Sequence, residues 1–293
     1  MAATRLTAPC KINLFLHIGA KRADGYHDIR TLFYPVAEPC DELRVTEAGG
    51  GGLVLTCSDP ALEGEGNLVA RAWRAFGERT GFAPDLAVHL VKRTPHGMGL
   101  GGGSSDAAAM LRYLNARAGE AALDAAGLSG LAAGLGADVP FFLLGAPALG
   151  EGIGERLTPV ACDLRAFSLL LVCPGVSVST AWAYGAFDRL AASSGKLPAN
   201  ALTNRRARST QTDSGARLVI ANDFEPAVFQ GFPELRRIKE RLLRLGAAAA
   251  ALSGSGAGLF GLFRDRAGAR EAASALRGQG LSVHTPQPTA RGA

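Results

Sequence analysis

Residues 95–105 read Pro-His-Gly-Met-Gly-Leu-Gly-Gly-Gly-Ser-Ser, and this stretch decides the fold. Five of its residues are glycine, and a residue without a Cβ lets backbone N–H groups come close to a ligand. Alternating apolar residues predict a strand at 86–91, and helical spacing predicts a helix over 104–118 with Ser104 as its N-cap. Because the free N–H groups at a helix start attract anions, the strand, loop and helix together predict a phosphate-binding site.

Three kinds of nucleotide loop are compatible with part of this pattern. Gly97-x-Gly99-x-x-Gly102 has dinucleotide-binding spacing, but residues 91–96 separate it from the strand and a basic pair precedes it. Gly97-x-x-x-x-Gly102 has Walker spacing, but Gly103 stands where that motif needs its lysine. A kinase loop followed by two serines needs no lysine inside it and fits best. A glycine-rich turn without a ligand is the remaining alternative, and the chain entropy of its glycines makes it costly.

The composition indicates a folded globular protein. The chain of 293 residues is 47% hydrophobic and 19% charged, which excludes disorder of the whole chain. No apolar run approaches the roughly 18–20 residues of a membrane helix, and we expect no signal peptide and no membrane partner.

The five cysteines are scattered without a Cys-x-x-Cys pair, so we expect free thiols in the cytoplasm and no protein-built metal site. The net charge of +5 suits anionic small ligands; without an RNA-binding motif, we expect no nucleic acid partner.

The order of the expected elements indicates two α+β halves. Strands and helices alternate in the first half, and after the glycine-rich residues 150–154 the pattern starts again. We therefore expect an N-terminal nucleotide-binding domain at 1–157 and a C-terminal domain at 158–293. Residues 192–217 are polar, which predicts a long mobile loop. The remaining elements are expected as strands at 11–18, 29–36, 43–46, 53–57, 168–173, 249–252, 258–263 and 281–284, and as helices at 67–79, 123–135, 178–190, 232–245 and 266–277.

Two further segments accompany the glycine loop. Residues 8–14 read Ala-Pro-Cys-Lys-Ile-Asn-Leu, and residues 252–257 read Leu-Ser-Gly-Ser-Gly-Ala. In chain order, residues 8–14, 95–105 and 252–257 resemble the first, second and third motifs of the GHMP kinase superfamily. Within that superfamily, four more segments resemble the branch that acts on 4-diphosphocytidyl-2-C-methyl-D-erythritol, namely residues 22–27, 136–140, 150–154 and 174–177.

The resemblance implies a two-domain α+β fold. The N-terminal domain is expected to be like domain 2 of ribosomal protein S5, and the C-terminal domain to be ferredoxin-like. ATP is the implied phosphoryl donor, and Mg²⁺ is expected with it. The residues expected at the ATP phosphates are those of the second motif: Pro95, His96, Gly97, Met98, Gly99, Leu100, Gly101, Gly102, Gly103, Ser104 and Ser105.

The implied reaction transfers the γ-phosphoryl group of ATP to the 2-hydroxyl of the methylerythritol part of the substrate, in the non-mevalonate isoprenoid pathway. Such a transfer needs deprotonation of the hydroxyl and neutralisation of charge. Asp138 is the expected base, and Lys11 is the expected cation that keeps it ionised. Asn13 shares a strand face with Lys11, by the period of two, and can reach the same ligand. From the residues alone, an aspartate closing a turn and a solvated lysine remain the alternatives.

The cytosine of the implied substrate is expected at three aromatic residues. Tyr26 and His27 follow a turn, and Tyr184 lies on a predicted helix. Two rings can sandwich a base, and histidine can hydrogen-bond to the edge of a pyrimidine. The third motif is expected to approach the substrate through Gly254, Ser255 and Gly256.

Two positions depart from the superfamily pattern. Cys10 replaces the usual alanine beside Lys11, and Met98 replaces the usual glycine or alanine of the loop. The functional alternatives are another GHMP kinase, acting on homoserine, mevalonate or a sugar, and a non-catalytic nucleotide-binding module. Residues 22–27 argue against the first alternative, and the presence of both Lys11 and Asp138 argues against the second.

Overall fold

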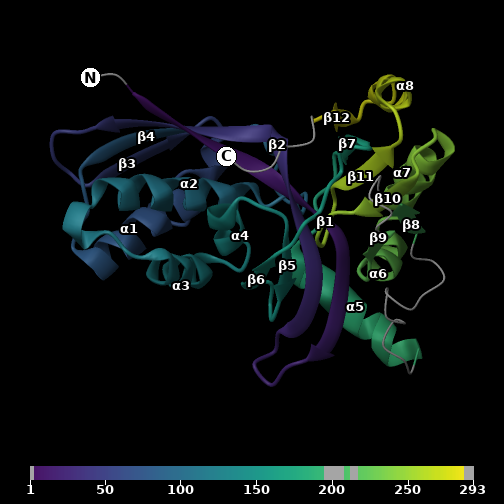
Figure 1. Ribbon diagram of the computed structural model, residues 1–293, viewed down its shortest axis with the longest axis horizontal. Helices are drawn as coiled ribbons and strands as arrows, with labels where there is room; N and C mark the ends of the chain where they lie inside the picture. Colours follow the sequence, from purple (N-terminus) through teal and green to yellow (C-terminus); the bar gives the residue numbers. More distant parts are fainter. Residues whose placement is uncertain (1–2, 195–207, 212–216, 287–293) are drawn as a thin grey trace. The chain divides into compact units, whose positions relative to one another are not determined.

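The computed structural model describes residues 3–194, 208–211 and 217–286. Its chain divides into two compact units (Figure 1). The first unit combines Met1–Cys10, Pro39–Pro95 and Gly101–Ala146, and the second combines Lys11–Glu38, His96–Leu100 and Pro147–Ala293. Two long strands, β1 (Thr4–Lys21) and β2 (His27–Glu47), contribute residues to both units.

The first unit is a sheet covered by helices. Its strand order is β3-β4-β2-β1, and β4 (Leu86–Val91) runs parallel to β3 (Leu53–Cys57) and antiparallel to β2. Alternate residues of β4 are buried, because one face of the sheet meets the core. Figure 1 shows the helices gathered along β3 and β4. They are α1 (Leu68–Thr80), α2 (Gly102–Arg117), α3 (Ala125–Leu135) and α4 (Val139–Leu144), with short 3-10 turns η1 (Pro60–Leu62) and η2 (Gly119–Ala121).

Local signals explain where the first helix of this unit begins and ends. Asn67 caps α1 by accepting a hydrogen bond from the backbone N–H of Val69, at 2.9 Å. Gly81 ends the helix in the left-handed region, with a φ of 75°. Of the apolar face that the helical spacing predicts, Ala72 and Phe76 are buried, whereas Leu68 and Trp73 are half-buried.

The second unit contains two sheet regions. In one, β9 (Arg217–Asn222) runs parallel to β1, with β8 (Arg208–Gln211) beyond it, and the hairpin of β5 (Ala148–Glu151) and β6 (Arg156–Pro159) pairs with β2. The other is a four-stranded antiparallel sheet of order β10-β11-β7-β12. Its strands are β7 (Ser168–Cys173), β10 (Ala249–Leu252), β11 (Leu259–Phe263) and β12 (Ser282–His284).

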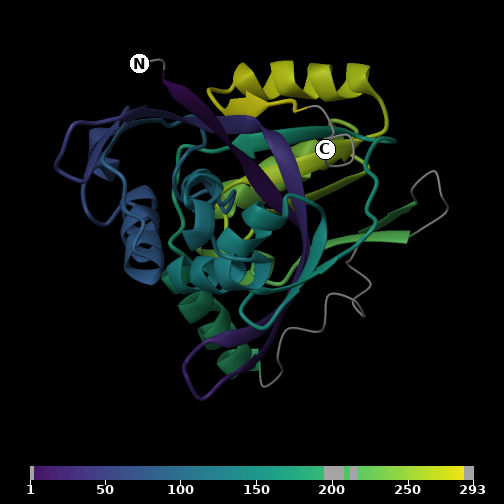
Figure 2. The same cartoon turned by 60° about the vertical axis from the view of Figure 1, so that its left-hand side comes forward.

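Two amphipathic helices cover the antiparallel sheet. α7 (Pro233–Arg244) packs on β10 and β11, and α8 (Arg266–Arg277), at the top of Figure 2, packs on β7, β11 and β12. Both strands of the β10–β11 pair are buried on both faces. α5 (Thr180–Ser194) and α6 (Glu225–Gly231) complete the unit. The α+β class expected from the order of elements is thereby confirmed.

The helix after the glycine loop begins earlier than predicted. α2 starts at Gly102, and its N-cap is Gly101, which adopts a left-handed φ of 72°. The prediction of Ser104 as N-cap is therefore wrong, because Ser104 lies inside the first turn. The glycines are responsible, since they allow the chain to turn into the helix two residues sooner.

Several other boundaries differ from the sequence predictions. The hairpin β5–β6 and the short helices α4 and α6 were not expected. The polar segment 192–217 is not a loop throughout: its first three residues end α5, Arg208–Gln211 forms β8, and its last residue begins β9. The rest of that segment lies outside the described residues.

Candidate functional site

The middle of the glycine loop, residues 96–100, belongs to the second unit, where the first motif holds one end of it. The backbone N–H of Lys11 donates to the carbonyl oxygen of Leu100 over 2.9 Å. Both residues are buried. The strand that carries the expected catalytic lysine is therefore fixed directly to the expected ATP loop.

The third motif holds the same segment from another side. The hydroxyl of Ser253 donates to the carbonyl oxygen of Gly99 over 3.0 Å. The backbone N–H of Ala257 donates to the carbonyl oxygen of Gly97, also over 3.0 Å. A further backbone bond joins Gly258 to Met98. All three motifs predicted from the sequence thus meet at residues 96–100.

Close packing at Gly99 leaves no room for a side chain. Its φ is +64°, and a Cβ would overlap the carbonyl oxygen of Ser253. Gly97 has a φ of +71°, and a Cβ there would overlap the hydroxyl of Ser177. Two glycines of the loop are therefore required by both backbone conformation and space. This narrow cradle suits phosphate oxygens approached by backbone N–H groups.

The loop enters α2 in the first unit, where two buried polar atoms face no partner. Ser105 is fully buried, and Asp106 is only 2% exposed. The Ser105 Oγ and the Asp106 Oδ1 have no hydrogen-bond partner among the residues that the structure describes. The start of α2 therefore supplies unsatisfied polar groups as well as the free N–H groups of its first turn.

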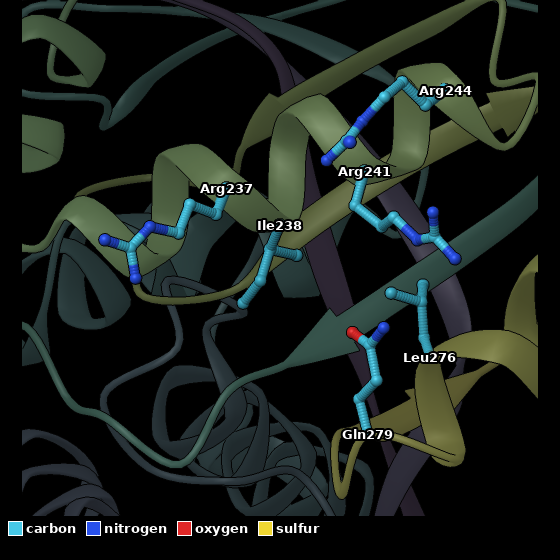
Figure 3. Close-up of a pocket in the computed structure, with 6 residues that line it drawn as sticks. All are labelled: Arg237, Ile238, Arg241, Arg244, Leu276 and Gln279. Carbon is cyan, nitrogen blue, oxygen red and sulfur yellow. The ribbon is translucent and has the colours of Figure 1, made fainter.

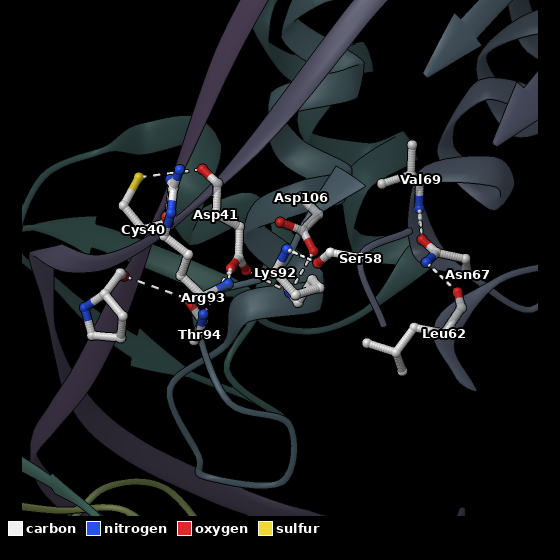
Figure 4. Close-up of polar contacts among 11 residues, drawn as sticks. Cys40, Asp41, Ser58, Leu62, Asn67, Val69, Lys92, Arg93, Thr94 and Asp106 are labelled. Atoms are coloured by element: carbon white, nitrogen blue, oxygen red, sulfur yellow. Dashed lines mark hydrogen bonds and ion pairs between the residues drawn. The ribbon is translucent and has the colours of Figure 1, made fainter. Parts of the chain in front are cut away.

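Lys92 links the two ends of the loop through buried carboxylates (Figure 4). Its Nζ lies 2.5 Å from the Asp41 Oδ2 and 2.8 Å from the Asp106 Oδ2. The other oxygen of Asp41 accepts the backbone N–H groups of Arg93 and Thr94, at 2.5 and 2.7 Å. Asp41 and Lys92 therefore hold the residues before the loop, and Asp106 holds the helix after it.

Burial and charge set the protonation of this group. Burial raises the pKa of Asp106 to about 7, although Lys92 acts in the opposite direction. Burial lowers the pKa of Lys92, but Asp106 and Asp41 outweigh it, so the net shift is upward. Lys92 is therefore held charged beside one carboxyl that titrates near neutral pH.

Lys11 and Asn13 share a strand face, as the period of two predicts. The Lys11 Nζ donates to the Asn13 Oδ1 over 2.7 Å, and the amide of Asn13 donates to the Thr31 Oγ1 over 2.8 Å. The hydroxyl of Thr31 in turn donates to the carbonyl oxygen of Phe15. Lys11 is 3% exposed, and its Nζ lies 5.3 Å from the ring centroid of Phe33. The ammonium group is thus oriented by a chain of hydrogen bonds.

Asp138 lies in the first unit, directly before α4. It occupies the N-cap position of that helix, but its side chain forms no capping hydrogen bond within the described chain. Pro140 stands in the first turn, where its missing N–H is tolerated. The carboxylate is half-buried. Because Lys11 belongs to the other unit, the expected pairing of the two stays a prediction.

The aromatic residues expected at the base lie together in the second unit. His27 and Tyr184 stack with ring centroids 5.4 Å apart and an interplanar angle of 14°. Phe224 meets the edge of Tyr184 at 4.8 Å. Tyr26, the neighbour of His27, is 61% exposed. The group therefore has a fixed ring and an exposed ring.

The imidazole of His27 is held from both sides. Its Nδ1 lies 3.0 Å from the carbonyl oxygen of Gly19, and its Nε2 lies 2.9 Å from the Asp188 Oδ1. Lys21 pairs with the same carboxylate at 2.6 Å. Burial acts to raise the pKa of Asp188, but the interactions with Lys21 and His27 outweigh it, so the pKa is lowered. A hydrogen bond from His27 to a pyrimidine would have to replace the contact with Asp188.

The third motif lies against the first two. A Cβ on Gly254 would come within 3.3 Å of the Gly99 Cα and 3.5 Å of the Asn13 Oδ1. The hydroxyl of Ser255 lies 3.1 Å from the Thr180 Oγ1. Of the three residues expected at the substrate, Gly254 is thus packed on the glycine loop itself.

Comparison with known proteins identifies this arrangement. Residues 67–146 match the N terminal domain of GHMP kinases, and residues 206–281 match the GHMP kinase C terminal domain. A 4-diphosphocytidyl-2-C-methyl-D-erythritol kinase of Solidesulfovibrio magneticus is 53% identical over 278 residues, covering 94% of each chain. The chain belongs to this family of GHMP kinases. A kinase of the same name from Nitratidesulfovibrio vulgaris is 47% identical, covering 96% of this chain and 98% of that one.

A solved structure supports the same family. The crystal structure of a 4-(cytidine 5'-diphospho)-2C-methyl-D-erythritol kinase superimposes with a TM-score of 0.76 at 35% identity, covering 98% of this chain and all of that one. The family and the two-domain α+β GHMP kinase fold expected from the sequence are thereby confirmed.

Three residues that hold parts of the site by hydrogen bonds were not predicted from the sequence. Thr31 orients Asn13, Lys92 joins the ends of the loop, and Asn222 binds carbonyl groups of the third motif. Each acts on a residue distant in sequence, so no local spacing points to it. Lys92 is 11% exposed at its side chain rather than solvated, because two carboxylates come from other elements to meet it.

A groove on the second unit is separate from these motifs (Figure 3). It has a volume of about 320 Å³ and lies between α7 and the end of α8. Its lining contains none of the residues expected at ATP or substrate, and consists of Arg237, Ile238, Arg241, Arg244, Leu276 and Gln279. The groove therefore contributes nothing to the site of this kinase.

Within residues 3–194, 208–211 and 217–286, no group of three or more His, Cys, Asp or Glu side chains gathers as a metal site would require. No helix in the same ranges is long and apolar enough to cross a membrane.

Proposed function

We propose that this kinase transfers the γ-phosphoryl group of ATP to the 2-hydroxyl of 4-diphosphocytidyl-2-C-methyl-D-erythritol. The products are the 2-phosphate and ADP, and the reaction belongs to the non-mevalonate route to isoprenoid precursors. The observation that carries the choice of substrate is the stacked pair of His27 and Tyr184, together with the exposed side chain of Tyr26, which precedes His27 in the chain. The names of relatives at 53% and 47% identity support the same choice.

ATP is assigned to the second motif, Pro95–Ser105. Gly97 and Gly99 have a positive φ, and a Cβ at either position would overlap a neighbouring oxygen atom. Without side chains, the backbone N–H groups of the loop and of the start of α2 can approach phosphate oxygens closely. Mg²⁺ is expected with ATP. When bound, Mg²⁺ would neutralise charge that develops on the transferred group.

Asp138 is assigned the role of general base, and Lys11 is assigned the stabilisation of negative charge. Asp138 would accept the proton of the attacking hydroxyl as a general base. Lys11 would stabilise negative charge on the attacking oxygen and the transferred group. Asn13 and Thr31 hold the lysine ammonium in place, so its orientation costs little when the substrate binds.

The cytosine ring is assigned to the aromatic group. Tyr184 cannot move freely, because His27 covers one face and Phe224 meets its edge. Tyr26 is exposed and can close on a base from the other side. Stacking on aromatic side chains contributes about 1–3 kcal/mol per base. Gly254, Ser255 and Gly256 would approach the methylerythritol end through their backbone.

We also propose that the enzyme works in the cytoplasm, on a small molecule, without a nucleic acid partner. None of the five cysteines is in a disulfide, and three of them are buried, which suits a reducing compartment. Relatives at 53% and 47% identity are named as kinases of 4-diphosphocytidyl-2-C-methyl-D-erythritol, which is a small molecule.

ADP release by the purified protein tests the proposed function. The assay contains ATP, Mg²⁺ and one acceptor at a time: 4-diphosphocytidyl-2-C-methyl-D-erythritol, its uridine analogue, mevalonate, homoserine or galactose. Turnover with the cytidine compound alone is the expected result. Turnover with another acceptor would retain the kinase chemistry and overturn the substrate. No turnover with any acceptor, while ATP still binds, would favour a binding module.

A further inference from the structure

Asn222 uses its whole side chain to hold backbone groups. It ends β9 and is 5% exposed. Its amide nitrogen donates to the carbonyl oxygens of Leu252 and Gly254, over 2.8 and 2.7 Å. Its amide oxygen accepts the backbone N–H of Phe224 over 2.9 Å. Both donors and one acceptor site of the amide are therefore occupied.

The two carbonyl groups belong to the third motif. Leu252 and Gly254 flank Ser253, and all three residues are buried. Buried carbonyl groups need hydrogen-bond partners, so replacing the amide of Asn222 would release this stretch of backbone. Glu225 also holds this backbone, because its Oε1 accepts a hydrogen bond from the backbone N–H of Leu252 over 3.1 Å.

The held backbone leads directly to the ATP loop and the catalytic lysine. Ser253 donates its hydroxyl to the carbonyl of Gly99, and Gly254 packs against both Gly99 and the amide oxygen of Asn13. Asn13 in turn receives the Nζ of Lys11. A shift of the Leu252–Gly254 backbone would therefore move both the phosphate cradle and the lysine.

The neighbouring carboxylate faces the other way. Asp223 accepts the backbone N–H of Ile18 at 3.0 Å and pairs with His17 at 2.6 Å. It therefore fastens the end of β9 to β1. Asn222, by contrast, donates hydrogen bonds to the carbonyl groups of the third motif.

We propose that Asn222 is a positioning residue for phosphoryl transfer: by holding the carbonyls of Leu252 and Gly254 it sets the geometry of the ATP loop without touching either substrate. The proposal rests on the proposed kinase function for its turnover measurement. The expected effect of Asn222 on nucleotide binding does not depend on which acceptor the enzyme phosphorylates.

The Asn222→Asp variant tests the proposal most directly. It keeps an oxygen for the N–H of Phe224, so the contact between Phe224 and Tyr184 is retained. It replaces the two N–H donors with an oxygen facing two carbonyl oxygens. We expect kcat to fall about 10–100-fold, because displacement by about 1 Å in a reactive geometry has this effect. Affinity for a non-hydrolysable ATP analogue, measured by calorimetry, should fall as well, while affinity for CDP stays unchanged.

Asn115 provides a matched control in the first unit. Its amide also bridges backbone groups, donating to the carbonyl of Leu123 at 3.0 Å and accepting the N–H of Leu123 at 2.7 Å. Asn115→Asp should lower thermal stability by a similar amount and leave kcat and both affinities unchanged. An equal loss of kcat in both variants, or wild-type kcat in Asn222→Asp, overturns the proposal. Loss of CDP affinity together with ATP-analogue affinity also overturns it, because that result indicates general disruption.

A second pair of variants serves if Asn222→Asp does not fold. Glu225→Ala removes the acceptor for the N–H of Leu252, whereas Glu225→Gln keeps an oxygen there. We expect lower ATP-analogue affinity in Glu225→Ala and recovery in Glu225→Gln. Equal affinity in the two variants would contradict the positioning role. If wild-type enzyme shows no turnover with the cytidine compound, the proposed substrate fails, and the ATP-analogue affinities still decide this inference.

Discussion

The hydroxyl of Ser253 donates a hydrogen bond of 3.0 Å to the carbonyl oxygen of Gly99, across 154 positions of sequence. The backbone N–H of Ser253 is bound as well, by the carbonyl of Gly258 at 2.9 Å. Ser253 therefore has little freedom, and its own carbonyl oxygen fills the space beside Gly99 where a Cβ would stand. Two motifs that lie far apart in the chain are fitted to each other at a single glycine.

Gly99→Ala is expected to abolish ATP binding at concentrations that saturate the wild type. The added Cβ overlaps a backbone carbonyl, which cannot move away as a flexible side chain could. The positive φ adds a cost of about 1–2 kcal/mol for any residue with a Cβ. Calorimetry with a non-hydrolysable ATP analogue measures the loss.

Gly119→Ala distinguishes backbone strain from the steric overlap with Ser253. Gly119 also has a positive φ, of +54°, but a Cβ there meets nothing within 4 Å. This variant should lose about the same stability from backbone strain alone, about 1–2 kcal/mol, and keep its ATP affinity. If Gly119→Ala lost ATP affinity too, backbone strain rather than the contact with Ser253 would be responsible.

Asp138→Ala is expected to abolish measurable turnover while the cytidine substrate still binds. A general base contributes about 10²–10⁴-fold to rate, and the residues assigned to positioning are unchanged. Substrate affinity by calorimetry and kcat by ADP release are measured on the same preparation. Full activity would remove Asp138 from the mechanism.

Asp124→Ala is the control for that variant. Asp124 caps α3 by accepting the N–H of Gly127 at 2.7 Å, so its removal should cost about 1 kcal/mol of stability. Its kcat should equal that of the wild type. The comparison distinguishes loss of a catalytic carboxylate from loss of a helix cap in the same unit.

Tyr26→Ala is expected to weaken substrate binding at least about tenfold, in line with the stacking free energy of one base. ATP affinity should not change. Tyr26→Phe, which keeps the ring, should bind the substrate as the wild type does. Val54 is a comparably exposed apolar side chain on β3, so Val54→Ala serves as the control. Equal losses of ATP and substrate affinity in Tyr26→Ala would refute cytosine stacking.

The sequence predicted those parts of the site that consist of contiguous motifs. Five glycines in residues 95–105 predict a phosphate loop, and the spacing of Lys11 and Asn13 predicts a shared strand face, which the 2.7 Å bond between them confirms. The roles assigned to these residues stay predictions, as does the domain division at 157/158.

The residues that escaped prediction act through tertiary pairing. Asn222 meets the third motif only because β9 runs parallel to β1 and ends beside β10, and a single sequence does not specify that pairing. A lysine that follows a strand is usually solvated, so the sequence does not predict that Lys92 is buried. In the structure, Lys92 pairs with Asp41 and Asp106, which come from other elements. The start of α2 was misplaced because N-cap rules favour serine, whereas a left-handed glycine here begins the helix.

The buried carboxyl of Asp106 is expected to make stability depend on pH. Its pKa is about 7 in the folded protein, against an ordinary value of 3.8. Between about pH 4 and 7 the folded protein retains a proton that the unfolded chain releases. The free energy of unfolding should therefore fall as the pH rises through this range, by at most about 1.4 kcal/mol per pH unit. Below and above the range this carboxyl adds no slope.

Asp106→Asn isolates that contribution. The amide cannot titrate, and its oxygen still accepts from the Nζ of Lys92. Urea unfolding at several pH values should show a smaller decline between pH 5 and 7 in this variant than in the wild type. Asp188→Asn is the control, because the pKa of Asp188 is lowered and its ionisation supports stability only above its own, more acidic range. An unchanged slope in Asp106→Asn would show that Asp106 is ionised throughout, held so by Lys92.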